Sequence, residues 1–294
     1  MSRGFRDRAA AAVMGAIALS CLLLAFGIAV ALVLKSRPIL ATTPIGRLLL
    51  SSSWRPSRGD FGFYPFIIGT LWVSGLAMAF AIPVCLLGAI YLSEYATSRV
   101  RAAAKPLLDM LAGIPPVVFG LWGVLGIVPL VSKLGTRLGS FTMGYSVLAA
   151  GIVLAVMVFP IIVSVTEEVL RKVPLEVREA SLSLGATRWQ TTKHVVLRAA
   201  FPGVFAATIL GFSRAFGETM AVLMVAGNGY AQPHSLLDPA QTLPALIANN
   251  FGEMMSIPLY DSALMFAALL LLVVVLVFNV LATFVLRAVE RRMA

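Results

Sequence analysis

The sequence predicts an all-α polytopic membrane protein with six transmembrane helices. Hydrophobic residues make up 60% of the 294 residues and charged residues only 12%, whereas a soluble domain carries about 25% charged residues. Mean hydropathy is +0.94. Five charge-free runs recur along the chain, and each can form a helix across a hydrocarbon core, which takes about 20 residues. A sixth apolar run, from Pro202 to about Ala226, is interrupted only by Arg214 and Glu218. We therefore expect one transmembrane domain, residues 1–294, with spans at 9–34, 67–91, 110–132, 144–166, 202–226 and 262–286.

The first span could be mistaken for a cleaved signal peptide, because Arg3, Arg6 and Arg8 precede it. It is longer than the apolar region of such a peptide, which has about 7–15 residues, and no small-residue cleavage site follows. We therefore expect it to be retained. Cys21 and Cys85 both fall within spans, where they are expected to pack as small apolar residues.

Prolines interrupt the next part of the chain. The outer segment 35–62 contains Pro38, Pro44 and Pro56, and residues 45–50 in its middle are expected to lie on the membrane surface. Spans two, three and four contain Pro83, Pro115, Pro116 and Pro160. Helix-breaking residues inside spans are tolerated where neighbouring helices or water satisfy the freed carbonyl groups.

The segment 167–201 between spans four and five has the strongest local signals. Pro174 suits a first helical position, so a helix is expected from Leu175 to Leu184. Gly185 fits the left-handed position that ends it. Thr187 and Gln190 have the spacing of a capping box, which begins a second helix running to about Ala200, before Pro202 opens span five. A DNA-binding helix-turn-helix is implausible between two spans, and we expect no nucleic-acid partner.

Span five carries two charges, Arg214 and Glu218. They are four residues apart, so on a continuous helix they lie on one face and can pair. An arginine at the centre of a membrane helix costs about 2.5–3.5 kcal/mol on insertion scales, so the side chain should face a partner, a cavity or a substrate. The hydroxyl residues within the spans can bond to their own helix; they are Thr70, Ser74, Ser146, Ser164, Ser213 and Thr219.

The distribution of basic residues predicts the orientation. With both termini on one side, that side and the 167–201 segment hold fifteen of the 23 Lys and Arg residues, and the other side holds seven. Cytoplasmic loops carry the excess of Lys and Arg. We therefore expect a multi-pass protein of the cell (inner or cytoplasmic) membrane with both termini in the cytoplasm.

The 179–197 stretch resembles the coupling motif of the membrane subunits of binding-protein-dependent ABC importers, E-A-A-x3-G-x9-I-x-L-P. It reads Glu179-Ala180-Ser181, three residues, Gly185, nine residues, then Val195-Val196-Leu197-Arg198. Ser181 and Val195 are conservative departures, whereas Arg198 replaces the proline, so the helix could continue to a break at Pro202. The resemblance implies that Glu179, Ala180 and Gly185 couple the spans to a separate ATPase.

Stretches elsewhere are similar to the PstC-type permease family of phosphate-specific importers: 61–62, 65–71, 89–95 and Gly217-Glu218-Thr219-Met220-Ala221-Val222. This resemblance implies four protein or ligand partners, in addition to membrane lipid. They are a second homologous permease (PstA-like), an ATPase homodimer, an extracytoplasmic phosphate-binding protein and phosphate. It also implies that Arg214, Glu218 and Thr219 lie in the substrate pathway. A guanidinium matches a phosphate group, and our hypothesis is that Arg214 exchanges Glu218 for the anion. The alternative is a purely structural ion pair.

The sequence lacks a Walker A pattern, a catalytic triad, a metal-ligand cluster and a cofactor fingerprint. We therefore expect a transporter subunit, not an enzyme, that obtains ATP hydrolysis from its partner. Two other functions stay open: a permease for another tetrahedral oxyanion, such as sulfate or molybdate, and an ATPase-independent secondary transporter, for which the required internal symmetry is not visible. An integral membrane enzyme is a more distant alternative.

Overall fold

The computed structural model describes residues 3–253, 257 and 259–293, and this part of the chain is mostly helical. The longer helices are α1 (Arg3–Thr42), α3 (Tyr64–Ile90), α4 (Ser98–Gly113), α7 (Val147–Arg171), α10 (Leu197–Phe216) and α13 (Tyr260–Met293). The shorter ones are α2 (Ile45–Leu50), α5 (Pro116–Trp122), α6 (Val128–Arg137), α8 (Leu175–Ser183), α9 (Arg188–Thr191), α11 (Met220–Val225) and α12 (Leu243–Asn250).

Three π-helical segments and a small hairpin complete the described elements. The π-helical segments are η2 (Tyr91–Tyr95), η3 (Gly123–Ile127) and η4 (Thr192–Val196). Strands β1 (Trp54–Arg55) and β2 (Asp60–Phe61) pair antiparallel across the 3-10 turn η1 (Pro56–Arg58).

Six helical stretches are long and apolar enough to cross a membrane, which confirms the predicted all-α architecture. They are Ala10–Thr42, Tyr64–Tyr95, Pro116–Arg137, Val147–Arg171, Arg188–Phe216 and Tyr260–Arg287. The first extends beyond its predicted end, because Pro38 lies inside α1 without ending it.

The third span begins later than predicted. We expected it to start at residue 110 and to contain Pro115 and Pro116. Instead α4 ends at Gly113, and α5 begins at Pro116. A proline disfavours helical conformation in the residue before it, and Pro115 is accordingly extended, with ψ 140°. The preceding helix α4 has no buried residue, so it forms a separate element beside the spans.

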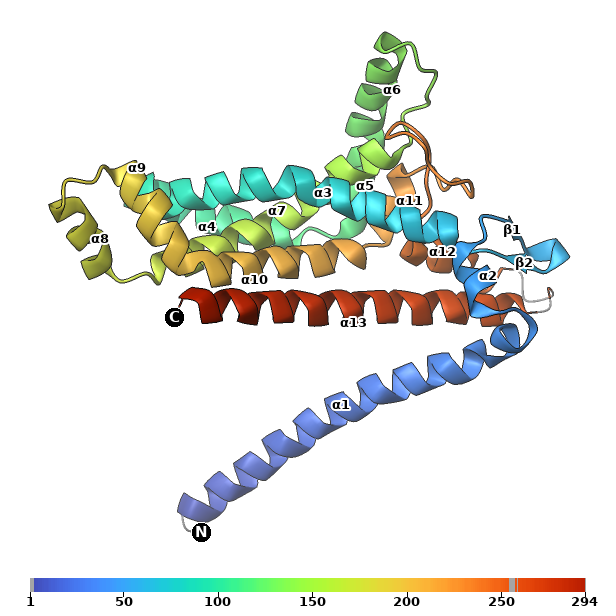
Figure 1. Cartoon of the computed structure of the whole chain (residues 1–294), viewed down its shortest axis with the longest axis horizontal. Coiled ribbons are helices and arrows are strands. Elements are labelled where there is room, and N and C mark those ends of the chain that lie inside the picture. Colours follow the sequence, from blue (N-terminus) through green and yellow to red (C-terminus); the bar gives the residue numbers. More distant parts are fainter. Residues whose placement is uncertain (1–2, 254–256, 258, 294) are drawn as a thin grey trace.

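Helices α3 and α7 form the centre of the main core, and α10 packs on both (Figure 1). Ala77 and Cys85 of α3 and Leu154 and Val158 of α7 are buried there. Helix α13 lies along α10, whereas α1 slants away from the bundle (Figure 1). Residues 10–28 of α1 are all exposed. The start of α1 and the end of α13 lie at the same end of the molecule as α8 and α9 (Figure 1).

A second, smaller core lies at the opposite end of the bundle, beside β1 and β2. The Trp54 ring makes edge contacts with Phe61, Phe63 and Phe66 at centroid distances of 5.1–5.6 Å. The expected surface segment at 45–50 forms helix α2, whose Leu48 is fully buried in this cluster. The cluster joins the segment after α1 to the start of α3 and α13.

Candidate coupling and transport site

The coupling knob, residues 175–191, has the helix–turn–helix form that its sequence predicts. Gly185 has φ +83°, in the left-handed region, and its N–H group donates to the Leu182 carbonyl at 2.9 Å. Both bonds of the capping box are present. The Thr187 N–H group donates to Gln190 Oε1 at 2.8 Å, and the Gln190 N–H group donates to Thr187 Oγ1 at 3.3 Å.

The tip of the knob is exposed and carries two large apolar side chains. Glu179, Ala180 and Gly185, the residues of the coupling motif, are all exposed. Leu184 is 89% exposed and Trp189 is 52% exposed. Large apolar side chains are therefore exposed at the turn of the knob and on its second helix.

The knob runs directly into span five, contrary to our prediction. We expected its second helix to end near Ala200 and a break at Pro202. The helix instead continues from Arg188 through Arg198 and Pro202 to Phe216. Proline at position 202 removes one backbone N–H donor, but α10 is held against α7 at the next residue. A Cβ atom on Gly203 would lie 2.3 Å from Val169 Cγ1.

A second glycine brings α10 close to α7 near the charged residues. A Cβ atom on Gly211 would lie 2.5 Å from both Cδ1 and Cγ1 of Ile162. No side chain larger than hydrogen fits there without a shift of Ile162. The two glycines are two helical turns apart, so α10 and α7 are in close contact along this length.

Arg214 and Glu218 do not form the predicted pair. Helix α10 ends at Phe216, and α11 begins at Met220, so the two residues lie on either side of a helix break. Among the described residues, the ion pairs within 4.0 Å do not include this one. Pairing at i,i+4 requires a continuous helix, and the helix is interrupted here at Gly217, where Glu218 bonds to the start of α11.

The three predicted pathway residues, Arg214, Glu218 and Thr219, gather at this break. Glu218 Oε1 accepts a hydrogen bond from the Ala221 N–H group at 3.2 Å, which caps the start of α11. Thr219 Oγ1 donates to the Gly217 carbonyl at 3.2 Å. The Arg214 side chain is exposed and has no hydrogen-bonding or ion-pair partner within the described residues. The break thus places an uncompensated cation next to a capped helix start.

Asn279 of α13, which was not among the predicted site residues, bonds to the residue before Arg214. Ser213 Oγ donates to Asn279 Oδ1 at 2.8 Å, so α10 is joined to α13 across the span instead of bonding to its own helix. Thr70, in contrast, donates to the Phe66 carbonyl of its own helix at 2.7 Å, as expected. A single polar amide within the apolar run 262–286 was the signal that could have identified Asn279.

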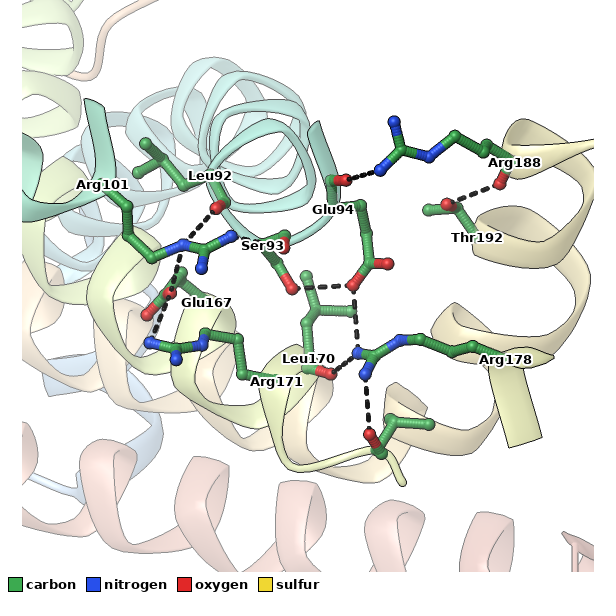
Figure 2. Close-up of polar contacts among 11 residues, drawn as sticks. Leu92, Ser93, Glu94, Arg101, Glu167, Leu170, Arg171, Arg178, Arg188 and Thr192 are labelled. Atoms are coloured by element: carbon green, nitrogen blue, oxygen red, sulfur yellow. Dashed lines mark hydrogen bonds and ion pairs between the residues drawn. The ribbon is translucent and has the colours of Figure 1, made fainter. Parts of the chain in front are cut away.

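Charged side chains collect where the knob meets the bundle (Figure 2). Arg178 of α8 lies 3.1 Å from Glu94 of η2. Glu167 of α7 pairs with Arg101 of α4 at 3.8 Å and with Arg171 at 3.5 Å. This network was not predicted from the sequence, because its partners are up to 94 residues apart.

Comparison with known proteins agrees with this architecture. Residues 81–294 match the family described as "Binding-protein-dependent transport system inner membrane component". The matched range contains the coupling knob and the break after α10. Within the described residues, we find no group of three or more His, Cys, Asp or Glu side chains that could hold a metal ion.

Several relatives align over most of the chain. The chain is 39% identical over 222 residues to "Probable ABC transporter permease protein YqgH" of Bacillus subtilis (strain 168), covering 75% of this chain and 70% of that protein. It is 35% identical to "Phosphate transport system permease protein PstC" of Xylella fastidiosa (strain Temecula1 / ATCC 700964), covering 82% and 79%. The protein of the same name from Mesorhizobium japonicum is 32% identical, covering 94% and 89%.

Solved structures share the fold at low sequence identity. A crystal structure of a bacterial ABC transporter involved in alginate import contains a chain with a TM-score of 0.60 and 16% identity, which covers 98% of this chain and 99% of that one. An inward-facing MetNI methionine ABC transporter gives a TM-score of 0.57 at 20% identity, covering 75% and 93%. The chain therefore belongs to the family of binding-protein-dependent transport system inner membrane components, the membrane permeases of ABC importers.

Proposed function

We propose that the chain is a permease subunit of an ATP-driven importer of inorganic phosphate and forms half of its translocation pathway. Phosphate is supported by the relatives named phosphate transport system permeases, which match over about four fifths of the chain or more. The observation that carries the ATP-driven mechanism is the exposed apolar knob, which continues without a break into span five. The proposed partners are an ATPase homodimer at the knob, a second homologous permease and an extracytoplasmic phosphate-binding protein.

The proposed orientation places the knob and both termini in the cytoplasm. The lysine and arginine bias favours this orientation. It is also supported by the position of the start of α1 and the end of α13, which lie at the knob end of the bundle (Figure 1). The protein itself is not an enzyme in this proposal, because ATP is bound and hydrolysed by the partner.

We propose that Arg214 contacts the anion as it passes and that Glu218 and Thr219 shape the helix break beside it. The exposed guanidinium has no counter-charge within the described residues, and its planar fork matches a phosphate oxyanion. The Glu218 carboxylate is already engaged with the Ala221 N–H group at 3.2 Å, so it supports the break instead of neutralising Arg214. Weak contact with the anion suits a conduit that must also release it.

The test is uptake of radiolabelled phosphate by proteoliposomes that contain the complete complex. We expect uptake that requires ATP and the ATPase, with unlabelled phosphate as the effective competitor. Effective competition by sulfate or molybdate would instead identify another oxyanion importer. Uptake that persists without the ATPase would identify a secondary transporter. Purification of the chain should also recover an ATPase and a second permease in a fixed complex.

A further inference from the structure

One ion pair joins the coupling knob to a span with which the knob has no covalent connection. Arg178 Nη2 of α8 lies 3.1 Å from Glu94 Oε1, and the two side chains are only 17% and 13% exposed. Ser93 Oγ donates to the same Glu94 oxygen at 2.8 Å. Along the chain, the knob connects only to α7 and α10. Glu94 belongs to η2, the continuation of α3, 84 residues earlier.

The same guanidinium also holds the end of α7. Arg178 Nη2 donates to the Leu170 carbonyl at 2.8 Å, and Nη1 donates to the Val173 carbonyl at 2.9 Å. These carbonyl groups lie at the C-terminal end of a helix, where a cation is favourable. Arg178 therefore fixes α8, α7 and η2 to one another through a single side chain, as Figure 2 shows.

The second helix of the knob contacts the same segment. Arg188 Nη2 donates to the Glu94 carbonyl at 3.3 Å, and its guanidinium lies 5.7 Å from the centroid of the Tyr95 ring. On the other side of η2, Arg101 of α4 donates to the Leu92 and Ser93 carbonyls at 2.8 and 2.9 Å. Arginines from both knob helices and from α4 thus hold η2. Arg178 does so through the Glu94 carboxylate, whereas Arg188 and Arg101 bond to backbone carbonyl groups.

We infer that Glu94 and Arg178 are positioning residues that make α3 move together with the coupling knob. This inference rests on the proposed function, in which an ATPase moves the knob. Without the pair, motion would reach α3 only through its packing on α7 and α10 and through the exposed Arg188, which contacts the Glu94 carbonyl and the Tyr95 ring. With the pair, it also reaches the end of α3 directly, so α3 moves together with α10, the span that continues from the knob. If the pair served stability alone, its loss would reduce assembly of the complex but would leave the phosphate transported per ATP hydrolysed unchanged.

The experiment measures phosphate uptake and ATP hydrolysis together in proteoliposomes with the complete complex. For Arg178→Gln and Glu94→Gln we expect the phosphate transported per ATP hydrolysed to fall at least fivefold, while ATP hydrolysis stays within twofold of wild type. Arg178→Lys retains the charge but not the planar fork of the guanidinium. Its ratio of phosphate transported to ATP hydrolysed should lie between those of the wild type and of Arg178→Gln. The matched control is Lys172→Gln, which breaks the exposed pair with Glu168 nearby and should leave the ratio unchanged.

A distance measurement separates positioning from stability. Spin labels at Leu182 of α8 and Leu87 of α3, in a Cys21→Ala, Cys85→Ala background, report the spacing of the knob and α3. In the protein without further changes, we expect one narrow distribution of label-to-label distances that is the same with and without ATP. In Glu94→Gln, we expect a broader distribution that changes with ATP.

Two negative outcomes are distinguishable. If the wild-type complex shows no ATP-dependent uptake, the proposed function is wrong. If the wild-type complex transports phosphate while both glutamine variants keep the wild-type ratio and label spacing, the inference about Glu94 and Arg178 is overturned. Because Glu94→Gln preserves the size of the side chain, it decides the question even if Arg178→Gln does not assemble.

Discussion

The hydroxyl groups of Ser181 and Thr191 lie 2.9 Å apart and join the two helices of the coupling knob. Ser181 occupies the position where the coupling motif has alanine, so this bond is an addition to the motif. Thr191 is 4% exposed, and its hydroxyl would lose its partner in Ser181→Ala. The bond therefore contributes to the rigidity of the knob.

Ser181→Ala should loosen the knob locally. A hydrogen bond contributes about 1 kcal/mol net, which corresponds to about fivefold faster amide hydrogen exchange in the turn between α8 and α9. The control is Ser183→Ala, whose exposed hydroxyl bonds only to the Glu179 carbonyl of its own helix. Equal exchange rates in the two variants would show that the bond does not hold the knob.

Gly185→Ala should weaken docking of the ATPase. Nothing lies within 4 Å of a Cβ atom at this position, but φ is +83°, and the left-handed conformation costs a residue with a Cβ about 1–2 kcal/mol. We expect about tenfold weaker binding of the ATPase and a smaller loss in Gly185→Asn, since asparagine tolerates this region. Gly139→Ala is matched, with φ +76° and open space, and should leave binding unchanged because it lies outside the knob.

Gly211→Ala should destabilise the contact between α10 and α7. Its Cβ atom would lie 2.5 Å from Ile162, and overpacking of this kind costs about 1–3 kcal/mol. We expect a lower thermal unfolding midpoint in detergent and partial recovery when Ile162→Ala is added. Gly75→Ala in α3, where nothing lies within 4 Å, should not lower the midpoint. An unchanged midpoint in Gly211→Ala would contradict the close approach.

Asn279→Leu should weaken the attachment of α13 to α10. Hydrogen bonds between membrane helices contribute about 0.6 kcal/mol on average and up to about 1.7 kcal/mol, so the loss of stability should fall in that range. Ser213→Ala should cost a similar amount, and the double variant little more than either. Strict additivity of the two losses of stability would exclude the bond between Ser213 and Asn279. The control is Thr283→Ala, whose hydroxyl bonds within α13.

Arg214→Lys should lower phosphate uptake at least tenfold without loss of assembly, because lysine retains the charge but not the planar fork. Arg198→Lys, exposed on the same helix, is the control and should transport normally. Phosphate uptake at the wild-type rate in Arg214→Lys would contradict the proposal that Arg214 contacts the anion.

Two substitutions of Glu218 distinguish its hydrogen bond to the start of α11 from its negative charge. Glu218→Gln keeps an oxygen that can accept from the Ala221 N–H group, so uptake should stay within about threefold of wild type. Glu218→Ala removes the cap, which costs about 1 kcal/mol, and should lower uptake further. If Glu218→Gln is as impaired as Glu218→Ala, the negative charge itself is required.

Local signals in the sequence predicted the features whose causes are local. The six spans follow from length and hydropathy, and the turn at Gly185 and the capping box at Thr187 follow from residues within a few positions of one another. The number of spans, the turn and the capping box were therefore predicted correctly, whereas the end of the first span and the start of the third were not.

Features that depend on tertiary packing were not predictable in the same way. Pro202 predicts a helix break in the sequence. In the structure the helix continues past it, where Gly203 packs closely on Val169. Arg214 and Glu218 read as a pair, but Glu218 caps the next helix instead. The Glu94–Arg178 pair joins residues 84 positions apart, and nothing in the local sequence of either residue indicates the other.

The π-helical segment η2 makes this part of the chain sensitive to the insertion or deletion of a residue. Its closing bond runs from the Ala96 N–H group to the Tyr91 carbonyl, five residues apart, at 2.8 Å. Such a segment contains one residue more than the α-helical path, and each residue turns a helix by about 100°. Deleting any one of residues 91–95 would restore the α-helical period and rotate Glu94 or its neighbours away from the arginines that hold them. A substitution here removes the contacts of one side chain, but a gain or loss of a single residue would disengage the whole segment.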